Sequence, residues 1–123
     1  MNQAETAYAL VLEARRREFD IVWYGFESDK IRLADGTWYT PDFTVIRFQC
    51  VTGPCIIEYH EVKGHMRTAE RVRLRVAASL RPWARFVLVW MKYDKRNRMW
   101  FVDNSEDVPC QPLQAFPTQR PEP

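Results

Sequence analysis

The stretch IIEYHEVKG, residues 56–64, carries most of what this 123-residue chain says about its fold. β-Branched and aromatic residues fill it and a glycine follows, which predicts a strand over 56–63. Successive side chains of a strand point to opposite faces. Glu61 and Lys63 are therefore expected to project from one face, while Val62 points into the core. The end of this strand would present a carboxylate and an ammonium side by side.

The stretch YTPDF, residues 39–43, supplies a second acidic side chain. A strand is predicted over 42–49, with Pro41 at its edge, and the TGP sequence at 52–54 predicts a turn. If the strands over 42–49 and 56–63 pair as a hairpin, their register allows Asp42 to lie beside Glu61. The sequence therefore brings two carboxylates and a lysine to one place.

The remaining pattern predicts a mixed α/β domain. The strand over 56–63, a helix over 68–80 and a buried strand over 86–91 form a plausible right-handed βαβ unit, with helices covering both faces of the sheet. Five of the eight prolines follow Asn104, so we expect one domain over 1–103 and an irregular, proline-rich tail over 104–123. Further helix and strand predictions are a helix over 3–19 and strands over 21–26, 31–33, 37–39 and 99–102.

Both helices are expected to bury an apolar stripe. Asn2 and Glu5 resemble a capping box at the start of the first helix. Arg73 falls within the stripe of the second helix, where it either snorkels or reaches toward the active site. Four of the five tryptophans, Trp23, Trp38, Trp90 and Trp100, are expected in the core. The stripes are Ala4, Tyr8, Val11, Leu12 and Phe19 in the first helix, and Ala69, Val72, Val76, Ala77 and Leu80 in the second.

Two neighbouring carboxylates repel each other and call for a cation, and hard oxygen ligands favour Mg²⁺. A metal ion there can polarise a phosphate and activate a water, while Lys63 orients that water or stabilises the developing charge. The residues Asp42, Glu61 and Lys63 thus predict phosphodiester hydrolysis.

The P-D pair followed by E-x-K, at Asp42, Glu61 and Lys63, resembles the signature of the PD-(D/E)XK nuclease superfamily. Residues 3–92 are similar to small phage- and prophage-encoded endonucleases. The resemblance implies a restriction-endonuclease-like core, a central mixed β-sheet flanked by helices in the order α-β-β-β-α-β. It also implies a Mg²⁺-dependent endodeoxyribonuclease, with Mn²⁺ as a substitute, that acts on branched or recombination intermediates.

The resemblance implies roles for single residues. Asp42 and Glu61 would ligate the metal together with the main-chain carbonyl of Val62, and Lys63 would assist the attacking water. Glu5 matches a further acidic position on the first helix and lies at the edge of that helix's buried stripe. Glu13 is expected on the far side, facing solvent. A purely structural role for Glu5 in the capping box stays open.

Arginines recur between residues 67 and 85 although the net charge of the chain is only +2. Such a run neutralises phosphates or merely solvates a helix face. DNA is therefore the expected partner of Arg67, Arg71, Arg73 and Arg75. Cutting two strands favours a homodimer. We expect no membrane segment or signal peptide, and three reduced cysteines in the cytoplasm of a bacterial or phage-infected cell.

Two other functions stay open. The chain could be a non-catalytic nucleic-acid-binding or assembly module that keeps a nuclease fold. A zinc module built from Cys50, Cys55, His60 and His65 is the third interpretation.

Overall fold

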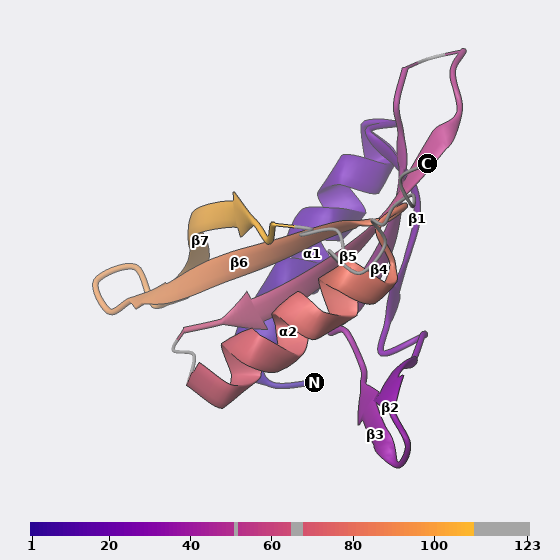
Figure 1. Ribbon diagram of the computed structural model, residues 1–123. Helices are drawn as coiled ribbons and strands as arrows, with labels where there is room; N and C mark the ends of the chain where they lie inside the picture. The colour runs from indigo at the N-terminus through magenta and orange to yellow at the C-terminus, as the bar shows by residue number, and fades with distance from the viewer. Residues whose placement is uncertain (51, 65–67, 110–123) are drawn as a thin grey trace, which may run out of the picture.

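The computed structural model describes residues 1–50, 52–64 and 68–109 of the chain, and a mixed five-stranded sheet forms its centre (Figure 1). The strands lie in the order β1-β4-β5-β6-β7, and only β5 and β6 are parallel neighbours. This arrangement confirms the predicted mixed α/β class and the parallel pairing across the second helix. The strands are β1 (Ile21–Phe26), β4 (Phe43–Phe48), β5 (Cys55–Lys63), β6 (Arg85–Asp94) and β7 (Met99–Asp107).

The two helices, α1 (Gln3–Arg17) and α2 (Thr68–Leu80), cover opposite faces of this sheet (Figure 1). Under α1, Tyr8 and Leu12 pack on Phe43, Val45 and other buried strand residues. Under α2, a second buried cluster forms around Leu74 and Leu88. Successive side chains of the strands therefore point alternately into the buried cluster under α1 and into the one under α2, as expected for a sheet with a helix on each face.

The capping box predicted for α1 is present. The Asn2 side chain accepts the Glu5 N–H, and the Glu5 carboxylate accepts the Asn2 N–H. The predicted stripe is only partly buried, because Val11 is 37% exposed and Phe19 is 82% exposed. The helix ends at Arg17, and Phe19 then adopts a positive φ of 63° that turns the chain toward β1.

The helix α2 is confirmed, but most of the buried stripe predicted for it is wrong, since Ala77 is the one member of that stripe that is buried. Val72, Val76 and Leu80 are exposed. The helix turns Leu74, Ala77 and Ala78 toward the sheet instead. The two alanines belong to the buried cluster that also contains Ile31 and Leu88. Helical spacing alone did not distinguish these two stripes, since both recur at intervals of three and four residues.

A small hairpin departs from the predicted order. The strands β2 (Ile31–Ala34) and β3 (Thr37–Tyr39) pair with each other as a separate two-stranded sheet, joined through the predicted turn at Gly36. Ile31 is 2% exposed and packs in the cluster under α2. The hairpin thus lies between β1 and β4 in the sequence, although these two strands are neighbours in the sheet. It packs beside α2 (Figure 1).

The last strand is longer than predicted. β7 runs to Asp107, so residues 104–107 are a strand rather than part of an irregular tail. Pairing with β6 supplies the backbone hydrogen bonds that the polar sequence gave no reason to expect. Residues 110–123 lie outside the described part of the chain, as do His65 and Arg67. In the described ranges, no helix is long and apolar enough to cross a membrane.

Candidate active site

The hairpin of β4 and β5 determines where Asp42 lies. Phe43 pairs with His60, so the register carried one residue further sets Asp42 opposite Glu61. The Val62 N–H donates a hydrogen bond of 2.8 Å to Asp42 Oδ2. Asp42 is 9% exposed and Glu61 is 7% exposed. The predicted proximity of the two carboxylates is therefore a property of the sheet.

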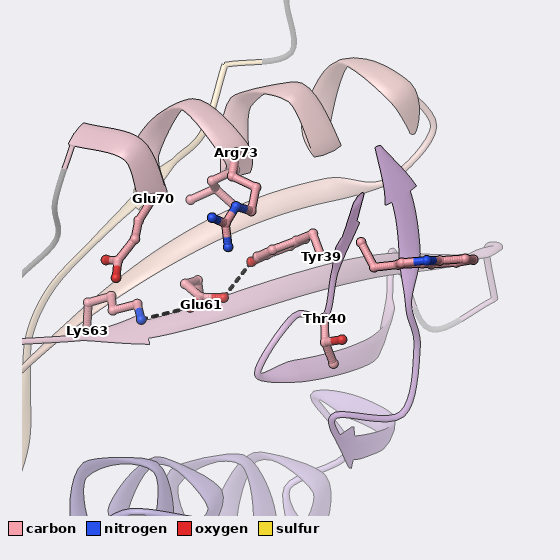
Figure 2. A pocket seen from close by; sticks show the side chains of 8 residues that line it. Tyr39, Thr40, Glu61, Lys63, Glu70 and Arg73 are labelled. Carbon is pink, nitrogen blue, oxygen red and sulfur yellow. Dashed lines mark hydrogen bonds and ion pairs between the residues drawn. The ribbon is translucent and has the colours of Figure 1, made fainter. Parts of the chain in front are cut away.

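The Glu61 carboxylate has a partner on each oxygen (Figure 2). The Tyr39 hydroxyl donates to Oε1 at 2.5 Å, and Lys63 Nζ lies 3.3 Å from Oε2. Glu61 and Lys63 share a face of β5, as alternation predicts. Tyr39 reaches the same carboxylate from the end of β3. The β2–β3 hairpin thus fixes the orientation of an acidic side chain on the central sheet.

The two carboxylates, Asp42 and Glu61, lie in an environment that favours a positive charge beside them. Burial and then the charge of Glu61 raise the pKa of Asp42 to about 8, against the lowering effect of the Val62 N–H. Burial lowers the pKa of Lys63, but the charges of Glu61, Glu70 and Asp42 outweigh it, so that the pKa lies above its usual value. Burial and the neighbouring carboxylate therefore oppose the ionisation of Asp42, and a cation would relieve this.

A cavity of about 190 Å³ opens next to this group. Glu61 and Lys63 line it from β5, Arg73 and Glu70 line it from α2, and Tyr39 belongs to its wall (Figure 2). Arg73 has no hydrogen-bond or ion-pair partner within residues 1–50, 52–64 and 68–109. Of the two placements predicted for Arg73, the structure has the one that reaches the site.

Glu5 sits at the start of α1, where its carboxylate serves the capping box. Its charge also contributes to the raised pKa of Asp42, so the two side chains are close enough to interact. Glu13, in contrast, does not face solvent freely. It accepts hydrogen bonds from Arg16, Arg17 and the Tyr24 hydroxyl, and so ties α1 to β1.

The other predicted DNA-binding arginines lie elsewhere. Arg71 stacks over the Trp90 ring, 5.8 Å from its centroid, and approaches Glu106 on β7. Arg71 and Arg75 both line a second cavity of about 290 Å³ beside β7. Arg67 lies outside the described residues. The predicted DNA-binding arginines therefore lie in two places. Arg73 lines the cavity beside Glu61, and Arg71 and Arg75 line the second cavity beside β7.

No group of three or more His, Cys, Asp or Glu side chains among the described residues is placed to hold a metal ion. The predicted ligand set is smaller than that, because it combines Asp42 and Glu61 with the Val62 carbonyl. These are hard oxygen donors in a site whose carboxylates repel each other, and this donor chemistry fits Mg²⁺ or Mn²⁺. Glu5, the further predicted ligand, does not join Asp42 and Glu61 in such a group of three among the described residues.

His60 belongs to a different, buried network on the α1 face of the sheet. Its Nε2 lies 2.8 Å from Glu58 Oε1, and its Nδ1 lies 2.7 Å from the Tyr8 hydroxyl. Arg47 and Arg85 hold the other oxygen of Glu58. Both ring nitrogens of His60 are thus engaged, and the described members of the predicted zinc set, Cys50, Cys55 and His60, form no metal-binding group. Cys50 and Cys55 are free and exposed, and His65 lies outside the described residues.

Several residues of the site and its surroundings were not predicted. Tyr39 precedes the P-D pair, and only its position beside that pair hinted at a role. Glu58 is 1% exposed, although the sequence gave no reason to bury it. The expectation that Trp23 and Trp38 lie in the core is wrong, because they are 44% and 53% exposed. Trp90 and Trp100 are half-buried.

Comparison with known proteins gives no match to a family model, to a curated protein or to a solved structure. The functional interpretation therefore depends on the geometry of the chain's own side chains.

Proposed function

We propose that this chain is a Mg²⁺-dependent endodeoxyribonuclease whose active site comprises Asp42, Glu61 and Lys63. One observation carries the proposal. Two buried carboxylates on adjacent strands lie beside a lysine at the open end of the hairpin. A structural role alone does not explain this arrangement, because burying two neighbouring acids beside a single lysine costs stability.

The topology supports the resemblance to PD-(D/E)XK nucleases. The elements α1, β1, β4, β5, α2 and β6 follow the order helix, three antiparallel strands, helix, strand. The hairpin β2–β3 and the strand β7 are additions to that order. We propose that the six shared elements are a restriction-endonuclease-like core, and that β2–β3 is an insertion that supports the site.

Asp42, Glu61 and the Val62 carbonyl would hold the metal, with Glu5 as a further acid near it. When bound, Mg²⁺ supplies charge neutralisation at the scissile phosphate and favours the deprotonation of water. The Lys63 ammonium would orient the attacking water and stabilise the negative charge that grows on the phosphate. The Arg73 guanidinium, which has no partner among the described residues, would bind a non-bridging phosphate oxygen.

The partners follow from this chemistry. Arg71, Arg75 and Arg67 would bind the DNA backbone beyond the site, and branched or recombination intermediates are the proposed substrates. A homodimer would present two sites to two strands. We place this activity in the cytoplasm of a bacterial or phage-infected cell.

One observation favours a second candidate, a DNA-binding module without catalysis. Tyr39 and Lys63 already engage both Glu61 oxygens, so a metal ion must share them. Such a module would bind DNA through its arginines and would not respond to divalent cations. Mg²⁺ or Mn²⁺ should raise the melting temperature of a metal-dependent nuclease and leave that of the module unchanged.

The decisive experiment for the function is a cleavage assay. Labelled four-way junction, flap, nicked and linear duplexes would be incubated with the full chain, with Mg²⁺ or with EDTA. We expect Mg²⁺-dependent cleavage of at least one substrate, and its loss in Glu61→Gln. Absence of cleavage on every substrate, or equal cleavage by Glu61→Gln, would overturn the proposal.

A further inference from the structure

Trp38 is an exposed aromatic side chain at the candidate active site. Although large and apolar, it is 53% exposed. It lines the same cavity as Glu61, Lys63 and Arg73. Exposing this much indole surface to water is unfavourable, and nothing in the core explains it, since its neighbour Tyr39 already supplies the contact to Glu61.

The hairpin that carries Trp38 is firmly held. Ile31 is buried against α2, and the Tyr39 hydroxyl bonds to Glu61. Just before the hairpin, Asp29 accepts a hydrogen bond of 2.7 Å from Arg81 and another from the Tyr59 hydroxyl. The Trp38 backbone is thus fixed relative to the site. A ligand that contacts the indole therefore does not have to order a flexible loop first.

The surroundings of Trp38 indicate the chemistry of such a ligand. Arg32 pairs across the hairpin with Trp38, which puts both side chains on the same face. Arg32 is largely exposed and forms an ion pair with Asp35. The cavity holds two cationic side chains, Arg73 and Lys63, beside the carboxylates of Glu61 and Glu70. Lys63 is paired with Glu61, whereas Arg73 has no partner among the described residues. An aromatic plane beside cationic groups suits a ligand with a flat π-face and a phosphate, which is a nucleotide.

The state of that nucleotide follows from the access to its base. In a continuous duplex each base is paired and stacked on its neighbours, so no base face is available to an indole at the strand end. An unpaired base exposes its face and can stack. A cavity of about 190 Å³ is too small for a duplex, so only part of one nucleotide, such as its base or its phosphate, can enter it.

We propose that Trp38 is a stacking platform for an unpaired nucleobase next to the scissile phosphate. The substrate class is then DNA with single-stranded nucleotides at the cleavage site, such as a fork, a flap or an open junction. This inference rests on the proposed nuclease function and specifies its substrate. Trp38 binds and positions the strand, whereas Asp42, Glu61 and Lys63 act on the phosphate.

The test measures binding in EDTA, so it does not depend on cleavage. Oligonucleotides carrying the fluorescent base 2-aminopurine, either unpaired in a fork or paired in a duplex of the same sequence, would be titrated with the full chain. We expect roughly ten-fold tighter binding of the fork and quenching of the unpaired base. Trp38→Ala should lose both effects, and Trp38→Phe should keep part of each. Trp83→Ala is the matched control, because Trp83 is 61% exposed but is not among the residues lining the cavity.

Equal affinity of the wild-type protein for fork and duplex would overturn the inference, even if Trp38→Ala failed to fold. Unchanged affinity and quenching in a folded Trp38→Ala protein would also overturn it, as would the same loss in Trp83→Ala. Failure of the proposed function looks different. A preference for the fork that depends on Trp38, without any Mg²⁺-dependent cleavage, would support the stacking platform and contradict the nuclease.

Discussion

Asp42 lowers the stability of the folded protein at the candidate active site. Its carboxyl lies beside Glu61, and burial together with that neighbour raises its pKa from 3.8 to about 8. A group whose pKa is raised on folding stabilises the protein fully below the unfolded value and loses that contribution as the pH rises toward the folded value. Asp42 therefore opposes folding at neutral pH unless a cation is bound.

Asp42→Asn tests this conflict. In EDTA at pH 7, we expect the melting temperature to rise by several degrees, because the amide carries no charge and its oxygen can still accept the Val62 N–H. Mg²⁺ should raise the melting temperature of the wild-type protein and not that of the variant. Thermal unfolding with and without Mg²⁺ gives both comparisons. A variant less stable than wild type in EDTA would show that Asp42 serves the fold instead.

Tyr39 is a positioning residue in this account, since its hydroxyl donates a hydrogen bond to Glu61. Tyr39→Phe removes a hydrogen bond to a charged group, worth about 1.5–3 kcal/mol. We expect kcat to fall by about ten-fold or more while the Kd for DNA in EDTA stays unchanged. Steady-state cleavage and a binding titration separate the two quantities. Equal kcat in Tyr39→Phe would show that Glu61 needs no fixed orientation.

Glu5 has a structural and a chemical explanation, which two substitutions can separate. Glu5→Gln keeps an acceptor for the Asn2 N–H but removes the charge near Asp42. Asn2→Ala breaks the cap and leaves that charge in place, at a cost of about 1 kcal/mol. If Glu5 serves the metal, cleavage should drop ten-fold or more in Glu5→Gln only. Glu13→Gln is unsuitable as an inert control, since Glu13 links α1 to Tyr24.

At the scale of elements, a polar network joins α1 to β5. Glu58 is buried, and burial alone would raise its pKa, but His60, Arg47 and Arg85 lower it from 4.5 to about 2. Burial lowers the pKa of His60. Because Glu58 is ionised, Nε2 of His60 donates to it, and Nδ1 is left to accept the Tyr8 hydroxyl. The carboxylate thereby fixes the side chain on which α1 docks.

This network predicts the acid stability of the fold. A carboxyl whose pKa is lowered on folding contributes fully above its unfolded value, and that contribution is lost as the pH falls from about 4.5 toward 2. The loss is about 3 kcal/mol for such a shift. Urea unfolding between pH 2 and 7 should show this slope in wild type and a flatter one in Glu58→Gln. Asp35→Asn, at a 95% exposed position, is the control and should match wild type. Parallel curves for Glu58→Gln and wild type would contradict the role of the network.

The elements themselves were largely predictable, whereas their buried faces were not. Alternation in residues 56–63 predicted β5 and the common face of Glu61 and Lys63, because period two is a local property of a strand. Which face of α2 is buried depends on how the helix packs against the central sheet and the β2–β3 hairpin, which is a tertiary property. β7 beyond Val102 has a polar sequence, and only its pairing with β6 makes it a strand.

The same distinction holds for the site at the scale of the whole molecule. Asp42, Glu61 and Lys63 come from one hairpin, so register alone was enough to bring them together. Tyr39 and Arg73 reach the site from an inserted hairpin and from α2, and their arrival depends on how these parts dock. The spacing of residues in the sequence does not predict how the hairpin and α2 pack against the central sheet. The residues that support the site were therefore harder to foresee than the residues at its centre.

Cleavage by Lys63→Ala is the most direct test of the central claim, because Lys63 is assigned to the chemistry and not to the metal. A DNA substrate that the wild-type protein cuts with Mg²⁺ would be incubated with this variant, and metal binding would be followed by calorimetry. The account predicts a folded protein that still binds Mg²⁺ and cleaves at least 100-fold more slowly, a difference of about 2.7 kcal/mol in barrier. A folded Lys63→Ala protein that cleaves at the wild-type rate would contradict the account.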